Sequence, residues 1–310
     1  DANDETTLRQ ETRLPGAISV WTLTDGTTGM QAQAVALAAA LCQHRPNCTH
    51  ADFQVSPHPL LRTLPRFGTF LRLPLYGKPQ TSFSYNTLPP ADEFPDILIT
   101  CGGRVAGIGL ALRQRARKAG VKTQLVQIQD PRLPPALFDA LVVPQHDTVR
   151  GPNVITTTGS LNRVTLDSVR RAMMELPSKW LVRDTAPTVV VMLGGDNRRY
   201  RVTPAMVATL AARLNQFAQS EPVRLVLLAS RRTPPTLVAE LTAALGDTRV
   251  LTIADDEDNP YPGILGVADA MIVTSDSVNM ASEVTITGKP VLIAGWRATN
   301  STPKNGQPAD

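Results

Sequence analysis

The sequence predicts an α/β protein built from two Rossmann-like, doubly wound domains that face a cleft. Apolar runs alternate with segments of helical periodicity through most of the 310 residues, which is typical of parallel sheets with crossover helices. The alternation pauses after residue 160 and restarts at residue 188, and the chain is long enough for two ordinary domains. We therefore expect a ligand in the cleft between the two domains.

The first half supplies the first sheet and its helices. Apolar residues dominate 17–23, 96–100 and 122–128, which we predict to be strands. Helical spacing predicts helices over 31–43 and 105–120. The segments LFDALVVP and NVITTTG add short strands before residue 160.

The second half repeats the pattern. Strands are predicted at 188–193 and 223–230, and helices at 204–219 and 234–246. Three further strands are predicted in TRVLTI, DAMIVT and PVLIAG, the last two flanking a short helix. The predicted organisation is an N-terminal domain at 17–165, a linker at 166–186, a C-terminal domain at 187–296, and disordered ends at 1–16 and 297–310. Between the two halves, residues 161–186 are expected to form a connecting helix and loop.

Two further segments carry alternatives. The proline-rich stretch 56–95 is long for a connection, so it is either a functional insertion or irregular structure. Within it, residues 59–78 mix basic with apolar side chains. This segment either lies on an anionic membrane surface or packs on its own domain.

Composition narrows the class of protein. With 42% hydrophobic and 19% charged residues, the chain resembles soluble globular proteins, and no stretch approaches the roughly 20 apolar residues of a membrane span. A net charge of +4 from scattered basic residues does not predict nucleic-acid binding. Cys42, Cys48 and Cys101 lack metal-ligand spacing, so we expect reduced thiols. The reduced thiols, a bacterial-like composition and a polar N-terminus together favour a cytoplasmic protein. Peripheral contact at the inner face of the membrane is an open alternative.

Candidate ligand-binding residues follow the predicted strands. Ligands of parallel sheets bind beyond the carboxyl ends of the strands. There, glycine allows close approach to an anion, helix N-termini offer free N–H groups, and arginine pairs with diphosphate. The candidates are Gly26, Gly29, Gly102, Gly103, Arg104, Gly194, Gly195, Asp196, Asn197, Arg198, Ser230, Arg231, Arg232, Ser275, Asp276 and Ser277.

Glu283 is the most specific single candidate. It lies six positions after Ser277 on a short helix whose other residues are mostly apolar. A carboxylate near a helix N-terminus either interacts favourably with the helix dipole or accepts the two hydroxyls of a ribose. Spacing alone leaves both interpretations open.

Other reactive residues have weaker patterns. The acidic run 255–258 could hold Mg²⁺, although such loops are usually only solvated, and we assign no metal site. Cys101 is a nucleophile or a packed thiol. His146, followed by Asp147, is an acid/base pair or a surface histidine.

Several motifs together resemble a known family. They are WTLTDGTTGMQAQAVALAAAL, VQIQDPRLPPALFDALVVPQHD, GPNVITTTGSLNRVT, LGGDN, SRRTP, NPYPGILGVADAMIVTSDSVNMASE and TGKPV. Their combination, from about residue 18 to residue 293, resembles the "elongated mitochondria" family of mitochondrial fission. This family is in turn similar to GT-B glycosyltransferases, including the peptidoglycan enzyme that adds N-acetylglucosamine to a lipid-linked acceptor.

The resemblance implies roles for particular residues. Asp25, Gly26 and Gly29 would meet the acceptor and the donor diphosphate, and Glu283 would hold the donor ribose. Ser275, Ser277 and Met280 would line the phosphate or sugar. The N-terminal domain would then be the acceptor side and the C-terminal domain the nucleotide-sugar side, with no cofactor besides the nucleoside-diphosphate sugar.

The chain also departs from the family pattern in two places. Many relatives have histidine at the position of Met30, so this chain could bind a sugar nucleotide without turning it over. Relatives also continue with a further helix beyond the last predicted strand, which would complete the second domain.

Three functions follow from these expectations. The first is metal-independent sugar transfer to a lipid-linked or membrane-surface acceptor. Asp25 would be the general base, with Asp130 or His146 as alternatives, and Arg198, Arg231 and Arg232 would balance the charge of the diphosphate. The second is a nucleotide-sugar epimerase. The third is a non-catalytic adaptor that recruits a protein partner, as the plant relative recruits a dynamin-related protein to the mitochondrial outer membrane.

Overall fold

The computed structural model describes residues 16–57, 83–85, 93–177, 186–196, 201–230, 232–246, 250–253 and 261–295. The chain divides into two compact units, residues 1–163 and 164–310. Most of the proline-rich stretch, including the basic and apolar segment 59–78, lies outside the described residues. So do nearly all of the two ends that were predicted to be disordered.

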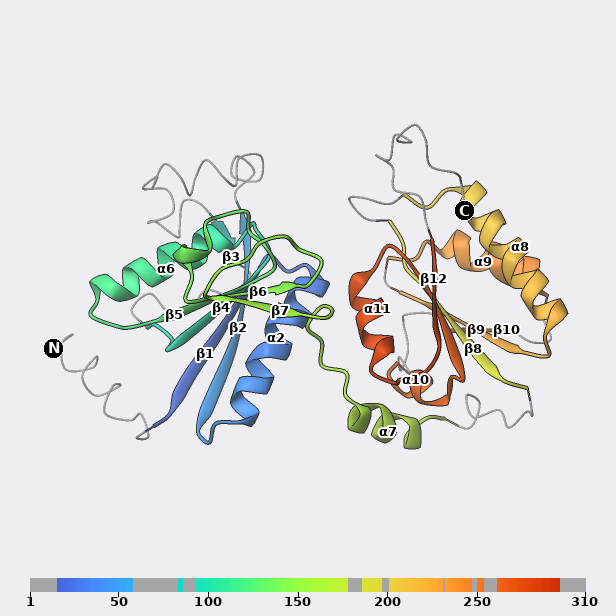
Figure 1. The fold of residues 1–310 in the computed structure, drawn as a ribbon, viewed down its shortest axis with the longest axis horizontal. Helices are drawn as coiled ribbons and strands as arrows, with labels where there is room; N and C mark the ends of the chain where they lie inside the picture. Colours follow the sequence, from blue (N-terminus) through green and yellow to red (C-terminus); the bar gives the residue numbers. More distant parts are fainter. Residues whose placement is uncertain are drawn as a thin grey trace. The chain divides into compact units, whose positions relative to one another are not determined.

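Unit 1 contains a seven-stranded sheet with the order β3-β2-β1-β4-β5-β6-β7 (Figure 1). Neighbouring strands are parallel except for β3, which runs antiparallel to β2. The strands are β1 (Ile18–Thr24), β2 (Cys48–Pro57), β3 (Phe83–Tyr85), β4 (Ile97–Cys101), β5 (Gln124–Ile128), β6 (Ala140–Pro144) and β7 (Val154–Thr157).

Two helices cover the two faces of this sheet. The helix α6 (Ala106–Lys118) packs with Leu23, Leu98 and Leu125, while α2 (Thr28–Gln43) packs with the opposite set of strand residues. A single turn of 3₁₀ helix, η2 (Pro135–Leu137), precedes β6. The predicted parallel sheet with crossover helices is therefore confirmed.

The strand β2 was missed because its face toward α2 is polar. Phe53 and Val55 pack on the α6 side, whereas Asp52 accepts hydrogen bonds from Thr22 in β1 and Gln31 in α2. Alternation of this kind places apolar residues at only every second position. It does not produce the continuous apolar run by which the other strands were recognised.

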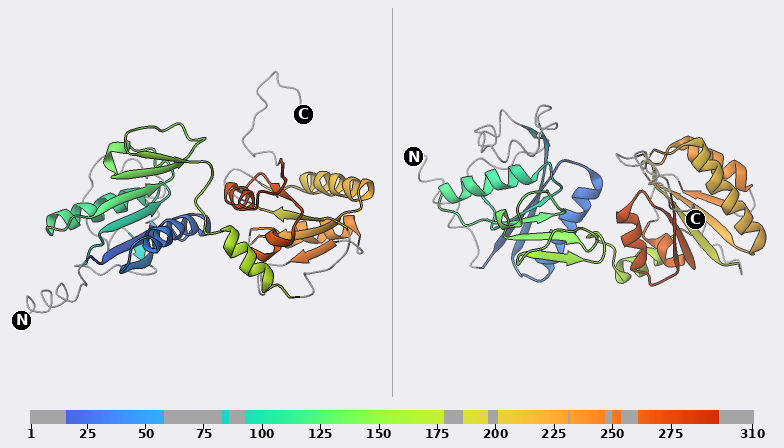
Figure 2. Two further views of the ribbon diagram at one scale, coloured as in Figure 1. Left: turned by 60° about the horizontal axis from the view of Figure 1, so that its bottom comes forward. Right: turned by 45° about the horizontal axis from the view of Figure 1, so that its top comes forward.

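Unit 2 repeats the doubly wound arrangement with the order β10-β9-β8-β11-β12, all parallel (Figure 2). The helices α8 and α9 cover one face, and α7, α10 and α11 cover the other. The strands are β8 (Thr188–Leu193), β9 (Arg224–Ala229), β10 (Val250–Ile253), β11 (Ala270–Thr274) and β12 (Val291–Ala294). The helices are α7 (Leu166–Met174), α8 (Pro204–Ser220), α9 (Pro235–Leu245), α10 (Gly263–Val267) and α11 (Val278–Thr285).

A carboxylate links the two central strands of each sheet in the same way. Asp96, just before β4, accepts the backbone N–H of Ser19 at 2.8 Å. Asp269, just before β11, accepts the backbone N–H of Thr188 at 2.7 Å. In both sheets these strands are the pair at which the strand order reverses, which is where ligands of doubly wound folds bind.

The stretch predicted to be a connecting helix and loop contains a helix that packs within unit 2. α7 lies against α10, where a Cβ added at Gly263 would come within 2.7 Å of the Ala172 carbonyl oxygen. The boundary between the units falls between Arg163 and Val164, so α7 belongs to unit 2. The sequence predicts a helix here but could not assign it to unit 2, because Gly263, on which the helix packs, lies about 90 residues further along the chain.

The expectation of three reduced thiols is wrong for two of them. Cys42, at the end of α2, forms a disulfide with Cys48, at the start of β2. Their Cα atoms are 5.0 Å apart, within the range that a disulfide spans. Cys101 is a free, buried thiol, and its burial raises its pKa. The pairing was missed because β2, which brings the two cysteines together, was not predicted.

No helix within the described part of the chain has the length and apolar character needed to cross a bilayer.

Replacing Gly263 by alanine tests the close packing of α7 on α10. The new Cβ would meet the Ala172 carbonyl oxygen and Leu176 Cγ at 2.7 and 2.9 Å, so the helices must move apart. We expect the free energy of unfolding to fall by about 1–3 kcal/mol, measured by chemical denaturation. Gly295→Ala is the matched control, because nothing lies within 4 Å of its added Cβ. Equal stability of the two variants would contradict this packing.

Candidate functional site

In unit 1 the loops that follow β1 and β4 are joined by an ion pair. Arg104 Nη1 lies 3.0 Å from Asp25 Oδ2, and the Asp25 side chain is only 10% exposed. The other oxygen, Asp25 Oδ1, accepts the backbone N–H of Thr27 at 3.1 Å. Both oxygens of the predicted general base are therefore engaged.

A buried glutamine that the sequence analysis did not single out organises the adjoining loops. Gln127 in β5 has no exposed surface, and its amide nitrogen donates to the carbonyls of Gly102, Ile128 and Gln129. Its amide oxygen accepts from Thr100 Oγ1 at 2.6 Å. A polar residue within an apolar strand was the available signal, because a buried amide needs such partners.

Met30 occupies the space next to the glycine turn after β4. Its sulfur lies 3.6 Å from Cys101 Sγ, and it would lie 3.3 Å from a Cβ at Gly102. Gly102 has φ +89°, a conformation that glycine adopts without strain. Gly26 is similar, with φ +76°, and a Cβ added there would lie 3.2 Å from Gln54 Oε1. The Met30 side chain thus packs directly on the loop that follows β4.

The loop after β5 presents Asp130 between two strained residues. Gln129 and Arg132 have φ +67° and +57°, in the left-handed region that non-glycine residues seldom occupy. Asp130 Oδ1 accepts the backbone N–H of Arg132 at 2.7 Å. This loop approaches the preceding one, since a Cβ at Gly103 would lie 3.6 Å from Pro131 Cα.

His146 is a poor candidate for a preorganised acid/base pair. Its side chain is 62% exposed, and its Nε2 lies 4.0 Å from Asp147 Oδ1, beyond hydrogen-bonding distance.

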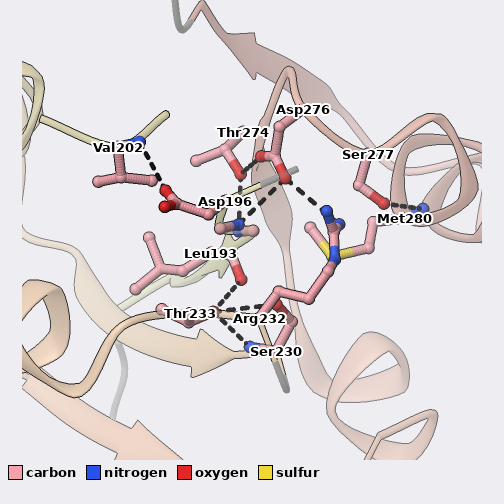
Figure 3. A network of polar contacts seen from close by, with 12 residues as sticks. Leu193, Asp196, Val202, Ser230, Arg232, Thr233, Thr274, Asp276, Ser277 and Met280 are labelled. Atoms are coloured by element: carbon pink, nitrogen blue, oxygen red, sulfur yellow. Dashed lines mark hydrogen bonds and ion pairs between the residues drawn. The ribbon is translucent and has the colours of Figure 1, made fainter. Parts of the chain in front are cut away.

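In unit 2 a buried carboxylate joins three loops (Figure 3). The side chain of Asp276 is 3% exposed and follows β11. It accepts from Thr274 Oγ1 at 2.7 Å, from the backbone N–H of Gly195 at 3.1 Å and from Arg232 Nη2 at 3.3 Å. Thr274 is the last residue of β11, Gly195 follows β8 and Arg232 follows β9, so one side chain holds together the carboxyl ends of three strands.

This network explains the two glycines after β8. A Cβ at Gly194 would collide with the carboxylate of Asp276, and a Cβ at Gly195 would collide with the Arg232 carbonyl oxygen. The N–H of Gly194 also donates to Thr274 Oγ1 at 2.8 Å. The glycines are needed for close approach to protein groups in the same unit.

Neighbouring candidates are similarly engaged. Asp196 accepts the backbone N–H of Val202 at 2.8 Å and contacts Arg201 at 3.3 Å. The backbone N–H of Ser230 donates to Thr233 Oγ1 at 2.7 Å, and that hydroxyl donates to the Leu193 carbonyl (Figure 3). These residues mainly fix the loops around Asp276.

Ser275 and Ser277 lead into α11. Ser277 is the N-cap residue and accepts the backbone N–H of Met280 at 3.4 Å. The backbone N–H of Ser275 donates to the Ala294 carbonyl at 2.9 Å. The first turn of α11 contains no acidic residue, so its N-terminal partial charge is not neutralised within the helix.

Glu283 has a different environment from Asp276. It is half-buried on α11, and its Oε2 accepts a hydrogen bond from the Tyr261 hydroxyl. Within the part of the chain that the structure describes, no hydrogen bond reaches Oε1. Burial raises the pKa of Glu283, and the hydrogen bond from Tyr261 acts in the opposite direction. Sequence analysis missed Tyr261, which lies 22 residues before its partner.

Lys289 holds the helix that follows Tyr261. Its Nζ donates to the carbonyls of Gly266 at 2.7 Å and Leu265 at 3.2 Å, at the end of α10. Burial lowers the pKa of Lys289. The lysine of the Gly-Lys-Pro sequence therefore caps α10 with its positive charge.

Three of the predicted binding residues and one acidic run fall outside the part of the chain that the structure describes. Asn197, Arg198 and Arg231 lie outside the described residues, as does the acidic run 255–258. Among residues that are described, no group of three His, Cys, Asp or Glu side chains is arranged to hold a metal ion.

The sequence matches the profile of the family described as Mitochondrial fission ELM1 over residues 28–306. The chain belongs to the mitochondrial fission ELM1 family. It is 34% identical to the mitochondrial fission protein ELM1 of Arabidopsis thaliana over 230 residues, which cover 65% of this chain and 52% of the plant protein. It is also 27% identical to the uncharacterised protein RP120 of Rickettsia prowazekii, covering 89% of this chain and 83% of that protein. This ELM1-family chain thus matches about half the length of the plant relative.

Solved structures show that the ELM1-family chain has a GT-B-like fold. UDP-GlcNAc 2-epimerase from Neisseria meningitidis, bound to UDP-GlcNAc, has a TM-score of 0.51 and 13% identity, covering 89% of this chain and 82% of that one. MnaA from S. aureus, in a structure with UDP, has a TM-score of 0.52 and 13% identity, covering 89% and 79%. The predicted fold class and family resemblance are both confirmed.

Replacing Asp276 by alanine tests its role in joining the loops. The substitution leaves the buried Gly195 N–H and Thr274 hydroxyl without their acceptor, and we expect a loss of about 2–4 kcal/mol in the free energy of unfolding. Asp167→Ala is the control, since that side chain is 83% exposed and its partner Arg170 is 69% exposed; it should cost less than about 0.5 kcal/mol. Denaturant titration of both variants measures the difference. Similar values would exclude Asp276 as the residue that holds the three loops.

Proposed function

We propose that unit 2 binds a nucleoside-diphosphate sugar, with Glu283 accepting hydroxyls of the ribose. The observation that carries this proposal is the state of the two carboxylates in the β11–α11 segment. Asp276 is saturated by protein groups, whereas Glu283 has one oxygen, Oε1, without a hydrogen bond from the described residues. A carboxylate oxygen in that state suits a hydroxyl-bearing ligand.

The diphosphate is assigned to the N-terminus of α11. Backbone N–H groups at a helix N-terminus bind phosphate, and the helix dipole favours the negative charge there. The side chain of Ser277 and the backbone N–H groups after it belong to the same short segment as Glu283. Arg232 is 41% exposed, so it could turn part of its charge toward the phosphates. This arrangement requires no metal ion.

Uridine nucleotides are the first ligands to test. The two solved structures described above contain UDP-GlcNAc and UDP. Their similarity to this chain extends to the fold only, so the base and the sugar are part of the proposal.

For a reaction we infer sugar transfer, with Asp130 as a better candidate base than Asp25. Asp25 is paired with Arg104 and also accepts the Thr27 N–H. Asp130 has one oxygen engaged by its own loop, and Oδ2 accepts no hydrogen bond from the described residues. A base must have a lone pair available to the acceptor hydroxyl.

A second candidate function is a non-catalytic adaptor that binds a sugar nucleotide and a protein partner. The Asp25–Arg104 ion pair and the packing of Met30 against Gly102 favour it, because both place protein groups against the loops after β1 and β4. The adaptor would be supported over the transferase and the epimerase by two results together. The wild type would bind a nucleotide sugar without turning it over, and the Met30→His variant would also show no turnover.

Isothermal titration calorimetry, with UDP-N-acetylglucosamine titrated into the protein, tests nucleotide-sugar binding. We expect saturable binding that Glu283→Gln weakens about 10- to 100-fold, because a hydrogen bond to a charged acceptor is replaced by one to a neutral acceptor. Glu240→Gln removes an exposed carboxylate on α9 and should bind as the wild type does. Absence of binding to the folded wild type, or equal affinities of the two variants, would contradict the proposal. Parallel titrations with GDP, CDP and TDP sugars define the base.

A further inference from the structure

We propose that Tyr261 is a positioning residue of this site: its hydroxyl fixes one oxygen of the Glu283 carboxylate so that the other accepts the ligand. This inference rests on the proposed nucleotide-sugar site and adds a residue that contacts Glu283 and not the ligand. Tyr261 lies immediately before α10, and Glu283 lies on α11.

The contact is directional. The Tyr261 hydroxyl donates to Oε2 of Glu283, and the described residues leave Oε1 without a donor. A carboxylate on a flexible side chain can rotate and exchange its two oxygens. A carboxylate that already accepts a hydrogen bond from a buried phenol loses that freedom before the ligand arrives. This lowers the entropic cost of binding the ligand.

Tyr261 is itself held by its surroundings. Its ring packs on the apolar cluster that includes Ile264, Leu265 and Val284. The helix that follows is fixed on one side by α7, through Gly263, and at its end by Lys289, through the carbonyls of Leu265 and Gly266. The phenol thus projects from an element with little room to move.

The charge on Glu283 depends on the same contact. Burial raises the pKa of Glu283, whereas the hydrogen bond from Tyr261 lowers it. Burial, together with the neighbouring carboxylate, raises the pKa of Tyr261, so the phenol stays protonated and remains a donor at neutral pH. Removing the hydroxyl should therefore raise the pKa of Glu283 further.

Within the described residues, few other charged groups lie on the elements that carry this pair. The sequence of α10 contains no titratable residue, and Glu283 is the only one in α11. Lys289, on the segment after α11, has its Nζ on α10 carbonyls, and Asp269 before β11 accepts the Thr188 N–H and raises the pKa of that lysine. Among the described residues, Tyr261 is the one group whose hydrogen bond is found to shift the Glu283 pKa.

The sign of the pH dependence follows from these contacts. Ligand binding that uses the carboxylate is weak at low pH, where Glu283 is protonated, and strengthens as pH rises through its pKa. In Tyr261→Phe that transition should move to higher pH. Glu283→Gln, which does not titrate, should remove the transition.

The experiment measures the dissociation constant of UDP-N-acetylglucosamine from pH 4.5 to 8 for the wild type, Tyr261→Phe and Glu283→Gln. This ligand is suitable because its esterified diphosphate does not titrate in the range, unlike free UDP. At neutral pH we expect Tyr261→Phe to bind about five- to tenfold more weakly, since one hydrogen bond to the carboxylate is lost. Its pH midpoint should lie above that of the wild type.

Controls separate positioning from packing. Phenylalanine keeps the ring, and thermal unfolding checks that the variant is folded. Tyr85→Phe, in β3 of unit 1, is the matched control and should change neither affinity nor midpoint. A Tyr261→Phe variant that binds like the wild type, or binds more weakly with an unchanged midpoint, would overturn the positioning role.

The outcomes also distinguish the two proposals. If the wild type does not bind UDP-N-acetylglucosamine or any other nucleotide sugar, the site itself is refuted. If the wild type binds and Glu283→Gln weakens binding while Tyr261→Phe does not, the site stands and the role of Tyr261 is refuted.

Discussion

The arrangement of unit 2 depends on one buried carboxylate, that of Asp276. A buried charge is tolerated only when hydrogen-bond donors surround it, because desolvation is otherwise costly. Here the donors come from the end of β11 and from the loops after β8 and β9, at the carboxyl edge of the sheet. Their convergence leaves no space for side chains at Gly194 and Gly195. The carboxyl edge of the sheet, where the strand order reverses, is thus built around a protein anion.

That constraint separates the roles of the two acidic residues in the β11–α11 segment. Asp276 precedes α11 and is saturated by protein donors, so it maintains the loops. Glu283 lies within α11, where Tyr261 occupies one oxygen and the described residues leave the other without a donor. The same type of side chain can therefore serve stability at one position and ligand binding at another, according to its neighbours.

The two units share a framework but differ at their carboxyl edges. Asp96 and Asp269 join the central strands of the two sheets in the same manner. Beyond this, unit 1 uses the neutral amide of Gln127 and the Asp25–Arg104 pair to order its loops. The packing of Met30 beside Gly102 adds an apolar group to that edge. At this edge of unit 1, Asp25 and Arg104 are therefore engaged by each other, and Gly102 is covered by Met30.

The sequence by itself determined the α/β class, the two repeated sheets and Glu283 as a candidate, because strand and helix periodicity are local properties. Only the tertiary structure decided which polar residues bond to one another. Glycine, serine and aspartate after a strand have the same local pattern whether they bind a ligand or a neighbouring loop. The contact of Tyr261 with Glu283 and those of Gly195 and Arg232 with Asp276 join segments that are distant in the chain, so no local pattern encodes them. The disulfide of Cys42 with Cys48 joins consecutive elements, but it depends on β2, whose alternating pattern was not recognised.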